Sequence, residues 1–224
     1  MLRPHQRALG AFFKSNFLQT VRGGLRGVWV RGELPQGACV LAGNHHSWWD
    51  SYLLPVLYWR MPRTVAIVVS DRRMAEFGFF PLLGAVAAGK PREALTALRR
   101  GEPLIIFPEG ELRAPGSLGE LNKGTVWFAQ KSGHPLVAVA SRVVCRGQEF
   151  PEAYLEFSPP LAPDLDVLRA TLNGMLERLD AQIRSEPAEQ PLSGFRLEVA
   201  GRPSTHERMA PWTAMLNRLT GRRG

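Results

Sequence analysis

Five short runs of apolar and β-branched residues predict buried strands along the chain. Each run is bounded by Gly, Pro or charged residues, and its apolar character is nearly continuous rather than alternating. Strands of this kind are covered on both faces, as in a parallel sheet between helices. The predicted strands are 38–42, 64–70, 104–107, 136–144 and 154–157.

Helical patterns lie between and after these strands. A helix over 92–100 follows a proline, which suits a first helical turn, and a helix over 124–131 ends at a Ser-Gly pair, which suits a C-cap. The longest helix, over 164–184, carries one apolar stripe, formed by Leu165, Leu168, Leu172, Met175, Leu176, Leu179 and Ile183. The pattern predicts an α/β fold: a single layered domain with a largely parallel sheet flanked by helices.

Both ends of the chain carry amphipathic helical patterns flanked by basic residues. Each has one apolar stripe, formed by Leu9, Phe12, Phe13, Phe17 and Val21 at the N-terminal end and by Met209, Trp212, Met215, Leu216 and Leu219 at the C-terminal end. Basic amphipathic helices can lie in a membrane interface, although packing on the core is the alternative for each. We therefore divide the chain into an N-terminal amphipathic segment (1–28), an α/β domain (29–200) and a basic amphipathic C-terminal tail (201–224).

Length and charge narrow the class of protein. With 224 residues and 45% hydrophobic content, the chain can form one well-packed domain. Its formal net charge of +8 indicates an anionic partner: nucleic acid, lipid headgroups or a phosphorylated small molecule. The sequence lacks helix-turn-helix, zinc-ligand and aromatic–glycine RNA signatures, so we expect no nucleic acid among its partners. No apolar run approaches the roughly 18 residues of a bilayer span, so we expect peripheral attachment to the cytoplasmic face of a membrane, with no transmembrane span.

The cysteines and paired histidines do not indicate a metal site. Cys39 and Cys145 lie in apolar, strand-like runs, so we expect buried, reduced thiols. Neither cysteine has a second Cys or a His at metal-ligand spacing. The adjacent His45 and His46 do not converge on one point, and no third ligand lies nearby, so we predict no metal.

The segment from Asn44 to Asp50 places a histidine and an aspartate directly after an apolar run. In a regular helix, five residues would turn His45 and Asp50 about 140° apart. They can meet only if His45 lies in the turn before a helix and Asp50 in its first turn. Ser47 suits the N-cap of that helix, with Asp50 three residues later as in a capping box. The competing interpretation is that Asp50 merely caps the helix and His45 is a loop residue.

His45 is the candidate general base of this segment. An imidazole is the usual base near neutral pH, and a carboxylate such as Asp50 holds the required tautomer. His46 would point away from His45. The sequence has no Gly-x-Ser-x-Gly elbow and no evident Ser or Cys nucleophile. A base without a protein nucleophile indicates that a hydroxyl of the substrate makes the attack.

A second charged segment follows the predicted strand 104–107. Phe107-Pro108-Glu109-Gly110 reads as a turn, and Glu111 and Arg113 add charge beyond it. Ligands bind in open α/β sheets outside the carboxyl ends of the strands, so these groups would face the same crevice as His45. Taken alone, the turn has an ordinary strand exit as its alternative.

In their order along the chain, these blocks resemble the glycerophospholipid acyltransferase family, the PlsC-type or 1-acylglycerol-3-phosphate O-acyltransferase group. The resemblance covers roughly 30–184. The family's Asn-His-x-Ser-x-x-x-Asp and Phe-Pro-Glu-Gly blocks match Asn44, His45, Ser47 and Asp50 and then Phe107, Pro108, Glu109 and Gly110. Two later stretches, 135–140 and 157–161, resemble the apolar strand and the strand end that follow in the family.

The resemblance implies direct transfer of a fatty acyl group from acyl-CoA or acyl-carrier protein to a hydroxyl of a lysophospholipid such as 1-acylglycerol-3-phosphate. It implies no cofactor besides this acyl thioester co-substrate, and a membrane lipid surface as partner. His45 would take the hydroxyl proton, and Asp50 would orient His45. The other matched positions would bind substrate, at Glu109 and Gly110, or support the site, at Asn44, Ser47, Phe107 and Pro108.

Two blocks depart from the family pattern, in which arginines are taken to grip the phosphate of the acceptor. Lys90 stands where the family has Arg, and Glu111-Leu112-Arg113 replaces Thr-Arg-Ser. Lys90 offers a point charge, whereas Arg113 offers a bidentate fork one residue farther on. We predict both as substrate-binding residues. The acceptor stays open between a lysophospholipid and a non-phosphate lipid, such as a glycolipid or glycosylated carotenoid, and a thioesterase or lipid hydrolase is the remaining alternative.

Overall fold

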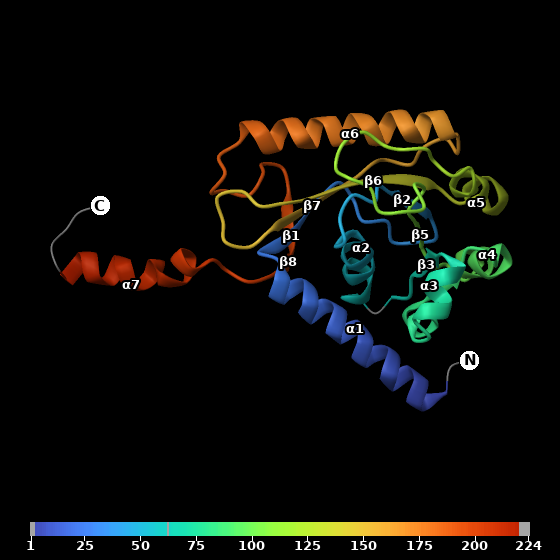
Figure 1. The fold of residues 1–224 in the computed structure, drawn as a ribbon, viewed down its shortest axis with the longest axis horizontal. Coiled ribbons are helices and arrows are strands. Elements are labelled where there is room, and N and C mark those ends of the chain that lie inside the picture. The colour runs from blue at the N-terminus through green and yellow to red at the C-terminus, as the bar shows by residue number, and fades with distance from the viewer. Residues whose placement is uncertain (1–2, 62, 220–224) are drawn as a thin grey trace.

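An eight-stranded sheet runs through the molecule, in the order β4-β3-β5-β2-β6-β7-β1-β8 (Figure 1). The computed structural model describes residues 3–61 and 63–219. Most neighbouring strands are parallel, whereas β6 with β7 and β1 with β8 are antiparallel. The strands are β1 (Gly27–Arg31), β2 (Val40–Gly43), β3 (Ala66–Val69), β4 (Ala85–Ala87), β5 (Leu104–Ile106), β6 (Leu136–Val144), β7 (Glu152–Phe157) and β8 (Arg196–Ala200).

Helices cover both faces of this sheet (Figure 1). Apolar residues of α4, α5 and α6 pack on one face of the sheet, and apolar residues of α1 and α2 pack on the other face. The helices are α1 (Pro4–Gly24), α2 (Asp50–Trp59), α3 (Asp71–Glu76), α4 (Pro91–Arg99), α5 (Gly124–Ser132), α6 (Leu165–Ser185) and α7 (Thr205–Leu219), with a 3-10 helix η1 (Phe80–Leu83).

Alternation along the central strands explains their continuous apolar character. Val40 faces the core under α4, α5 and α6, whereas its neighbour Leu41 faces the core under α1 and α2. Leu104 and Ile105 divide between the same two cores. Both faces of these strands are therefore covered, and burial of each large side chain contributes on the order of 2 kcal/mol.

The structure confirms the α/β fold with a largely parallel sheet, and each of the five predicted strands overlaps an observed strand. Three observed strands, β1, β4 and β8, were not predicted from the sequence. The strand β4 has only three residues, and β8 is an exposed edge strand, so neither leaves a long apolar run. One cysteine differs from its prediction: Cys39 is buried, but Cys145 is exposed, because it lies just past the end of β6.

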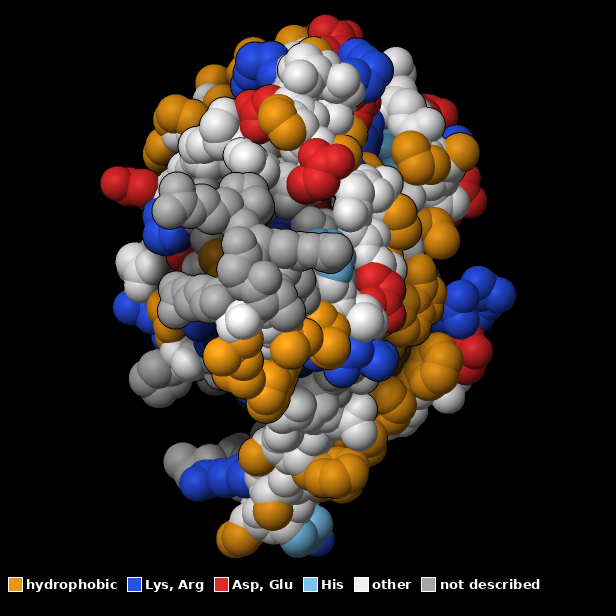
Figure 2. All heavy atoms as spheres, turned by 90° about the vertical axis from the view of Figure 1, so that its left-hand side faces the viewer, with side chains coloured by type: hydrophobic (Ala, Val, Ile, Leu, Met, Phe, Trp, Pro, Cys, Tyr) orange, Lys and Arg blue, Asp and Glu red, His pale blue; other side chains and the backbone are white. Residues whose placement is uncertain are grey.

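The N-terminal amphipathic helix α1 packs on the body through its aromatic residues. Phe17 stacks on Tyr52 of α2 with ring centroids 4.4 Å apart, and Phe13 stacks on Phe79 at the same distance. Leu9 and Phe12 stay exposed. The helix therefore both covers the core and presents apolar surface. In Figure 2, hydrophobic side chains lie at the surface along the lower part of the molecule, where α1 is, with basic side chains among them.

The C-terminal helix α7 is tied to the body at its first turn and then extends away from it (Figure 1). Glu207 pairs with Arg26 at 2.7 Å, and Thr205 bonds to Glu149. The predicted apolar stripe of this helix is exposed. Residues 220–224 of the predicted tail lie outside the described residues. The division of the chain at residues 28 and 200 stays a prediction, and β1 spans the first of these boundaries.

Candidate active site

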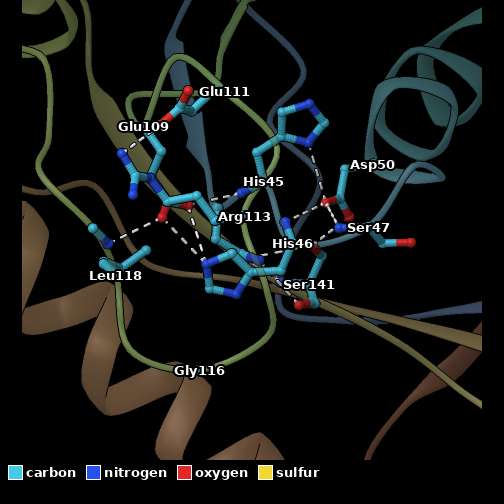
Figure 3. Close-up of polar contacts among 12 residues, drawn as sticks. His45, His46, Ser47, Asp50, Glu109, Glu111, Arg113, Gly116, Leu118 and Ser141 are labelled. Atoms are coloured by element: carbon cyan, nitrogen blue, oxygen red, sulfur yellow. Dashed lines mark hydrogen bonds and ion pairs between the residues drawn. The ribbon is translucent and has the colours of Figure 1, made fainter.

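The side chains of His45 and Asp50 meet at the C-terminal edge of the sheet. The strand β2 ends at Gly43 and delivers His45 into a loop, and Asp50 is the first residue of α2. Figure 3 shows the two side chains turned toward each other, with His45 Nδ1 3.4 Å from Asp50 Oδ2. This distance is at the long end for a hydrogen bond. The predicted geometry, a loop histidine and a first-turn aspartate, is confirmed.

The carboxylate of Asp50 is buried, with 2% of its surface exposed. Its Oδ2 accepts the backbone N–H groups of His46 at 2.8 Å and Ser47 at 2.7 Å, and its Oδ1 accepts the hydroxyl of Ser141 at 2.7 Å. A buried carboxylate needs such donors, because desolvation of an unpaired charge is costly. These three contacts fix the carboxylate beside His45.

Ser47 lies in a turn that leads into α2 rather than at the N-cap of that helix. The helix begins at Asp50, with Trp49 at the N-cap position. The Ser47 hydroxyl accepts the N–H of Trp49 at 3.2 Å, while the Ser47 N–H donates to Asp50. The predicted N-cap is therefore wrong by two residues. The bond from the acidic residue back to the Ser47 amide, which a capping box contains, is nevertheless present.

Asn44 extends the pairing of β2 with β6 beyond the end of β2. Its Oδ1 accepts the Ser141 N–H at 2.7 Å, and its Nδ2 donates to the Ser141 carbonyl at 3.2 Å. Ser141 thus contacts both Asn44 and Asp50. Ser141 was not among the predicted site residues, although it and Arg142 are the two polar residues of the predicted strand 136–144, which is a usable signal.

The charged segment after β5 bonds to both backbone groups of His45. The His45 N–H donates to Glu109 Oε1 at 3.0 Å, and the His45 carbonyl accepts the N–H of Arg113 at 2.9 Å. The imidazole stacks on Phe107, with ring centroids 4.6 Å apart. About 20% of the His45 side chain is exposed. When its Nδ1–H donates to Asp50, the Nε2 atom carries the lone pair that a general base needs.

Glu109 is buried, and its carboxylate accepts three N–H groups. Besides the His45 amide, these are the Gly119 amide at 3.0 Å and the His46 ring Nε2 at 3.2 Å (Figure 3). Burial acts to raise the pKa of Glu109, but the bonds from His46, His45 and Gly119 outweigh it and lower this pKa to about 2. The arrangement favours a positioning role for Glu109 over the substrate contact that the sequence predicted.

The turn after β5 requires glycine at its last position. The Gly110 N–H donates to the Phe107 carbonyl at 3.0 Å, and Gly110 has φ of +73°, which is costly for a residue with a Cβ. Pro108 is buried, and its carbonyl accepts the N–H of Asn122 at 2.8 Å. Gly110 itself is exposed, next to the charged residues of the loop.

The two predicted phosphate-binding cations are exposed and paired with acidic neighbours. Arg113 pairs with Glu111 at 2.7 Å, and Lys90 pairs with Glu93 at 3.4 Å. Arg113 shares the loop that contacts His45. Lys90 precedes α4 after β4, which is three strands away from β2 in the sheet. At about 4.8 Å per strand, this corresponds to roughly 14 Å. The structure thus brings Arg113, but not Lys90, beside the His45 backbone.

The ring of His46 projects to the opposite side of the segment from the ring of His45 (Figure 3). It is buried and contacts Glu109 rather than Asp50. Within the part of the chain that the structure describes, no group of three or more His, Cys, Asp or Glu side chains could hold a metal ion. Of the two rings, that of His45 is partly exposed and that of His46 is buried.

Comparisons with known proteins give a related sequence, a related fold and a matching family model. A 1-acyl-sn-glycerol-3-phosphate acyltransferase of Pseudomonas aeruginosa is 28% identical over 140 residues, which cover 55% of this chain and 51% of that protein. The chain thus matches about half the length of this curated relative. The crystal structure of the 1-acyl-sn-glycerophosphate (LPA) acyltransferase PlsC from Thermotoga maritima shares the fold, with a TM-score of 0.53 and 19% identity over 81% of this chain and 79% of that one.

The family model named Acyltransferase matches residues 27–142, more than half of the chain. The matched range begins at the first residue of β1 and ends within β6. It includes both segments of the site and the two residues of β6, Ser141 and Arg142, that contact them. The chain belongs to the acyltransferase family.

Proposed function

We propose that this protein transfers a fatty acyl group from a thioester donor to a hydroxyl of a lipid acceptor, with His45 as general base. The observation that carries this proposal is the contact of His45 Nδ1 with Asp50, whose carboxylate is fixed by three further donors. An imidazole held in this tautomer presents Nε2 as the proton acceptor. General-base help of this kind is worth about 10²–10⁴-fold in rate.

The reaction needs no covalent acyl-enzyme. His45 Nε2 takes the proton of the acceptor hydroxyl while its oxygen attacks the thioester carbonyl carbon. The new C–O bond forms, the C–S bond breaks, and the thiolate leaves with the proton that His45 returns. Asp50 stabilises the imidazolium between these two proton transfers, because its carboxylate lies against Nδ1. Thiolate is a good leaving group, so positioning and base catalysis are sufficient.

The acceptor that we propose is a lysophospholipid such as 1-acylglycerol-3-phosphate, and the donor is acyl-CoA or acyl-carrier protein. The name of the Pseudomonas relative supports the acceptor, and the net charge of +8 suits an anionic ligand. Arg113, on the loop that contacts the His45 backbone, would approach the phosphate. No cofactor or metal is part of this proposal.

A non-phosphate lipid, such as a glycolipid, is the second candidate acceptor. One observation favours it: Arg113, the predicted cation on the loop beside His45, already pairs with Glu111, and Lys90, three strands away, pairs with Glu93. These exposed pairs are each worth less than about 1 kcal/mol, so a phosphate could displace the carboxylates.

We also propose that the protein works at the cytoplasmic surface of a membrane, attached peripherally. Exposed apolar residues on α1 and α7 support this location: Leu9, Phe12, Met209, Trp212, Met215, Leu216 and Leu219. Among the described residues, no helix has the length and apolar character that crossing a bilayer requires. Attachment through helices lying in the interface would bring the lipid acceptor and the site to the same surface.

An acceptor panel tests this proposal. Purified protein is incubated with acyl-CoA or acyl-carrier protein and with lysophosphatidate, uncharged lysolipids or glycolipids, and the products are identified by mass. We expect acylated lysophosphatidate to dominate. Acylation of a glycolipid but not of lysophosphatidate would show that the second candidate is the acceptor. Release of free fatty acid at one rate with and without any acceptor would replace transfer by hydrolysis.

A further inference from the structure

The buried ring of His46 connects Arg142 on β6 with Glu109 in the turn after β5, and neither residue takes part in the proposed proton transfers. Its Nδ1 lies 2.9 Å from Arg142 Nη1 on β6, and its Nε2 lies 3.2 Å from the carboxylate of Glu109. Only 2% of the His46 side chain is exposed, and Arg142 and Glu109 are also buried. A buried histidine with both ring nitrogens engaged is held in one orientation.

The contact with Arg142 determines which nitrogen of His46 carries the proton. A guanidinium is always protonated and only donates, so His46 Nδ1 has to accept. The ring proton therefore resides on Nε2, where it can donate to the Glu109 carboxylate. The opposite tautomer would place two N–H groups against each other at Arg142 and leave Glu109 without this donor. Arg142 therefore donates to His46, and His46 donates to Glu109.

Arg142 also bonds to three other groups: the carboxylate of Asp180 and the backbone carbonyls of Gly116 and Ser141. Its Nε and Nη2 bond to the two carboxylate oxygens of Asp180 on α6, at 2.7 and 2.9 Å. The same guanidinium donates to the carbonyl of Gly116, at 3.2 Å, in the loop that follows Gly110. A bidentate pair of this kind has a defined geometry as well as a favourable energy. Through Arg142, the position of His46 is therefore fixed relative to β6 and α6, which are regular elements of the fold.

We propose that Asp180, Arg142, His46 and Glu109 form a hydrogen-bonded chain, buried except at the partly exposed Asp180, that positions His45, and that His46 acts in it as an obligatory donor to Glu109. The chain ends on His45, because Glu109 Oε1 accepts the His45 N–H at 3.0 Å. Displacement of Glu109 would release the amide of His45 and shift its ring relative to Asp50. This inference rests on His45 being the base, and it makes His46 a positioning residue rather than a catalytic one.

Two amide substitutions separate the two halves of the His46 ring. His46→Gln can keep an N–H near the position of Nε2, whereas His46→Asn keeps an oxygen near Nδ1 but loses the donor to Glu109. Misplacement of a catalytic group by about 1 Å costs on the order of 10²-fold in rate. We therefore expect kcat to fall about 10²-fold in His46→Asn and less than about tenfold in His46→Gln, with KM little changed in both. Equal kcat values in the two variants, at any level, would overturn the proposal.

Arg142→Met, with Arg146→Met as its matched control, keeps the proposal falsifiable if a His46 variant does not fold. Both arginines are buried, and both pair with a carboxylate, Arg142 with Asp180 and Arg146 with Glu152. Each substitution should lower the melting temperature. Only Arg142→Met should lower kcat of the remaining folded protein, by about 10²-fold. A similar kcat in both variants would show that the Arg142 contacts only stabilise the fold, and it would contradict the proposal.

Nitrogen-15 spectra of the histidine rings in the wild-type protein give a readout that is independent of activity. We expect His46 to show a protonated Nε2 and an unprotonated Nδ1. A protonated Nδ1 on His46 would overturn the proposal directly. Failure of the proposed function gives a different result. If a His45→Ala variant still transferred acyl groups, His45 would not be the base, but the His46 tautomer in the spectra would be unchanged.

Discussion

The hydroxyl of Ser141 donates a hydrogen bond to Asp50 Oδ1 across 2.7 Å in the buried floor of the site. Ser141→Ala removes this donor and leaves one oxygen of a buried carboxylate unsatisfied. A hydrogen bond to a charged group contributes about 1.5–3 kcal/mol. We expect the free energy of unfolding to fall by about that amount and kcat to fall roughly tenfold, as Asp50 loses its fixed orientation beside His45. Denaturant unfolding and acyl-transfer assays measure the two effects.

Ser158→Ala provides the control for this prediction. The Ser158 hydroxyl also bonds to the backbone of β6, at the Ala138 N–H, but it does not contact Asp50. We expect this variant to keep its kcat. An unchanged kcat in Ser141→Ala would show that the hydroxyl contributes only to folding.

Glu109 makes the stability of the fold sensitive to acid. Its pKa in the folded protein is about 2, below the ordinary value of 4.5. A depressed pKa contributes stability that is present above about pH 4.5 and is lost as the pH falls toward 2. The shift corresponds to about 3 kcal/mol. We predict that Glu109→Gln lowers the free energy of unfolding by this order at pH 7, and that the difference from wild type shrinks between pH 4.5 and 2. A difference that stays constant over that range would contradict the assignment.

Arg113 and Glu111 allow a test of the acceptor. If Arg113 binds the phosphate of lysophosphatidate, Arg113→Ala loses a charge-assisted bond worth about 1.5–3 kcal/mol, and KM for that acceptor should rise about tenfold or more. Glu111→Gln removes the competing carboxylate 2.7 Å away, so it should lower the same KM. Arg73→Ala is the control, because Arg73 also pairs with an acidic neighbour, Glu76, but lies on α3. Unchanged KM values in both Arg113→Ala and Glu111→Gln would favour the non-phosphate acceptor.

Membrane attachment depends in this proposal on the exposed apolar residues of α1 and α7. Phe12→Glu and Trp212→Glu each place a negative charge on an exposed apolar site. We predict that each weakens cosedimentation with anionic vesicles, by about tenfold or more for the double variant, with less effect on acyl transfer to a detergent-dispersed acceptor. Val167→Glu, at an exposed apolar position of α6, should bind vesicles as wild type does. Equal vesicle binding by all of these variants would place the attachment elsewhere.

Local sequence signals were sufficient for the central part of the fold. The runs at 104–107 and 136–144 are apolar on both faces because both faces are covered, and this burial is visible without the structure. The separation of His45 and Asp50 allowed only one arrangement in which they touch, a loop residue and a first-turn residue, and the structure has it. These features depend on spacing within a few residues.

Features that depend on distant pairing were not predictable in this way. Ser141 and Asp50 are 91 residues apart and meet only because β6 lies beside β2 in the sheet. The inward turn of Glu109 likewise depends on donors from two separate segments, at His46 and Gly119. A sequence pattern can mark these residues as polar within apolar surroundings, but their partners are set by the strand order.

The most direct test of the central claim compares acyl transfer by His45→Ala with transfer by wild type and by His134→Ala, in the presence of the preferred acceptor. His134 lies outside the site, in the connection between α5 and β6, so its removal controls for the loss of an imidazole. All three proteins are first shown to be folded by their melting curves. We predict that His45→Ala lowers kcat by about 10²–10⁴-fold while His134→Ala keeps the wild-type rate. Near-normal transfer by folded His45→Ala would show that His45 is not the base.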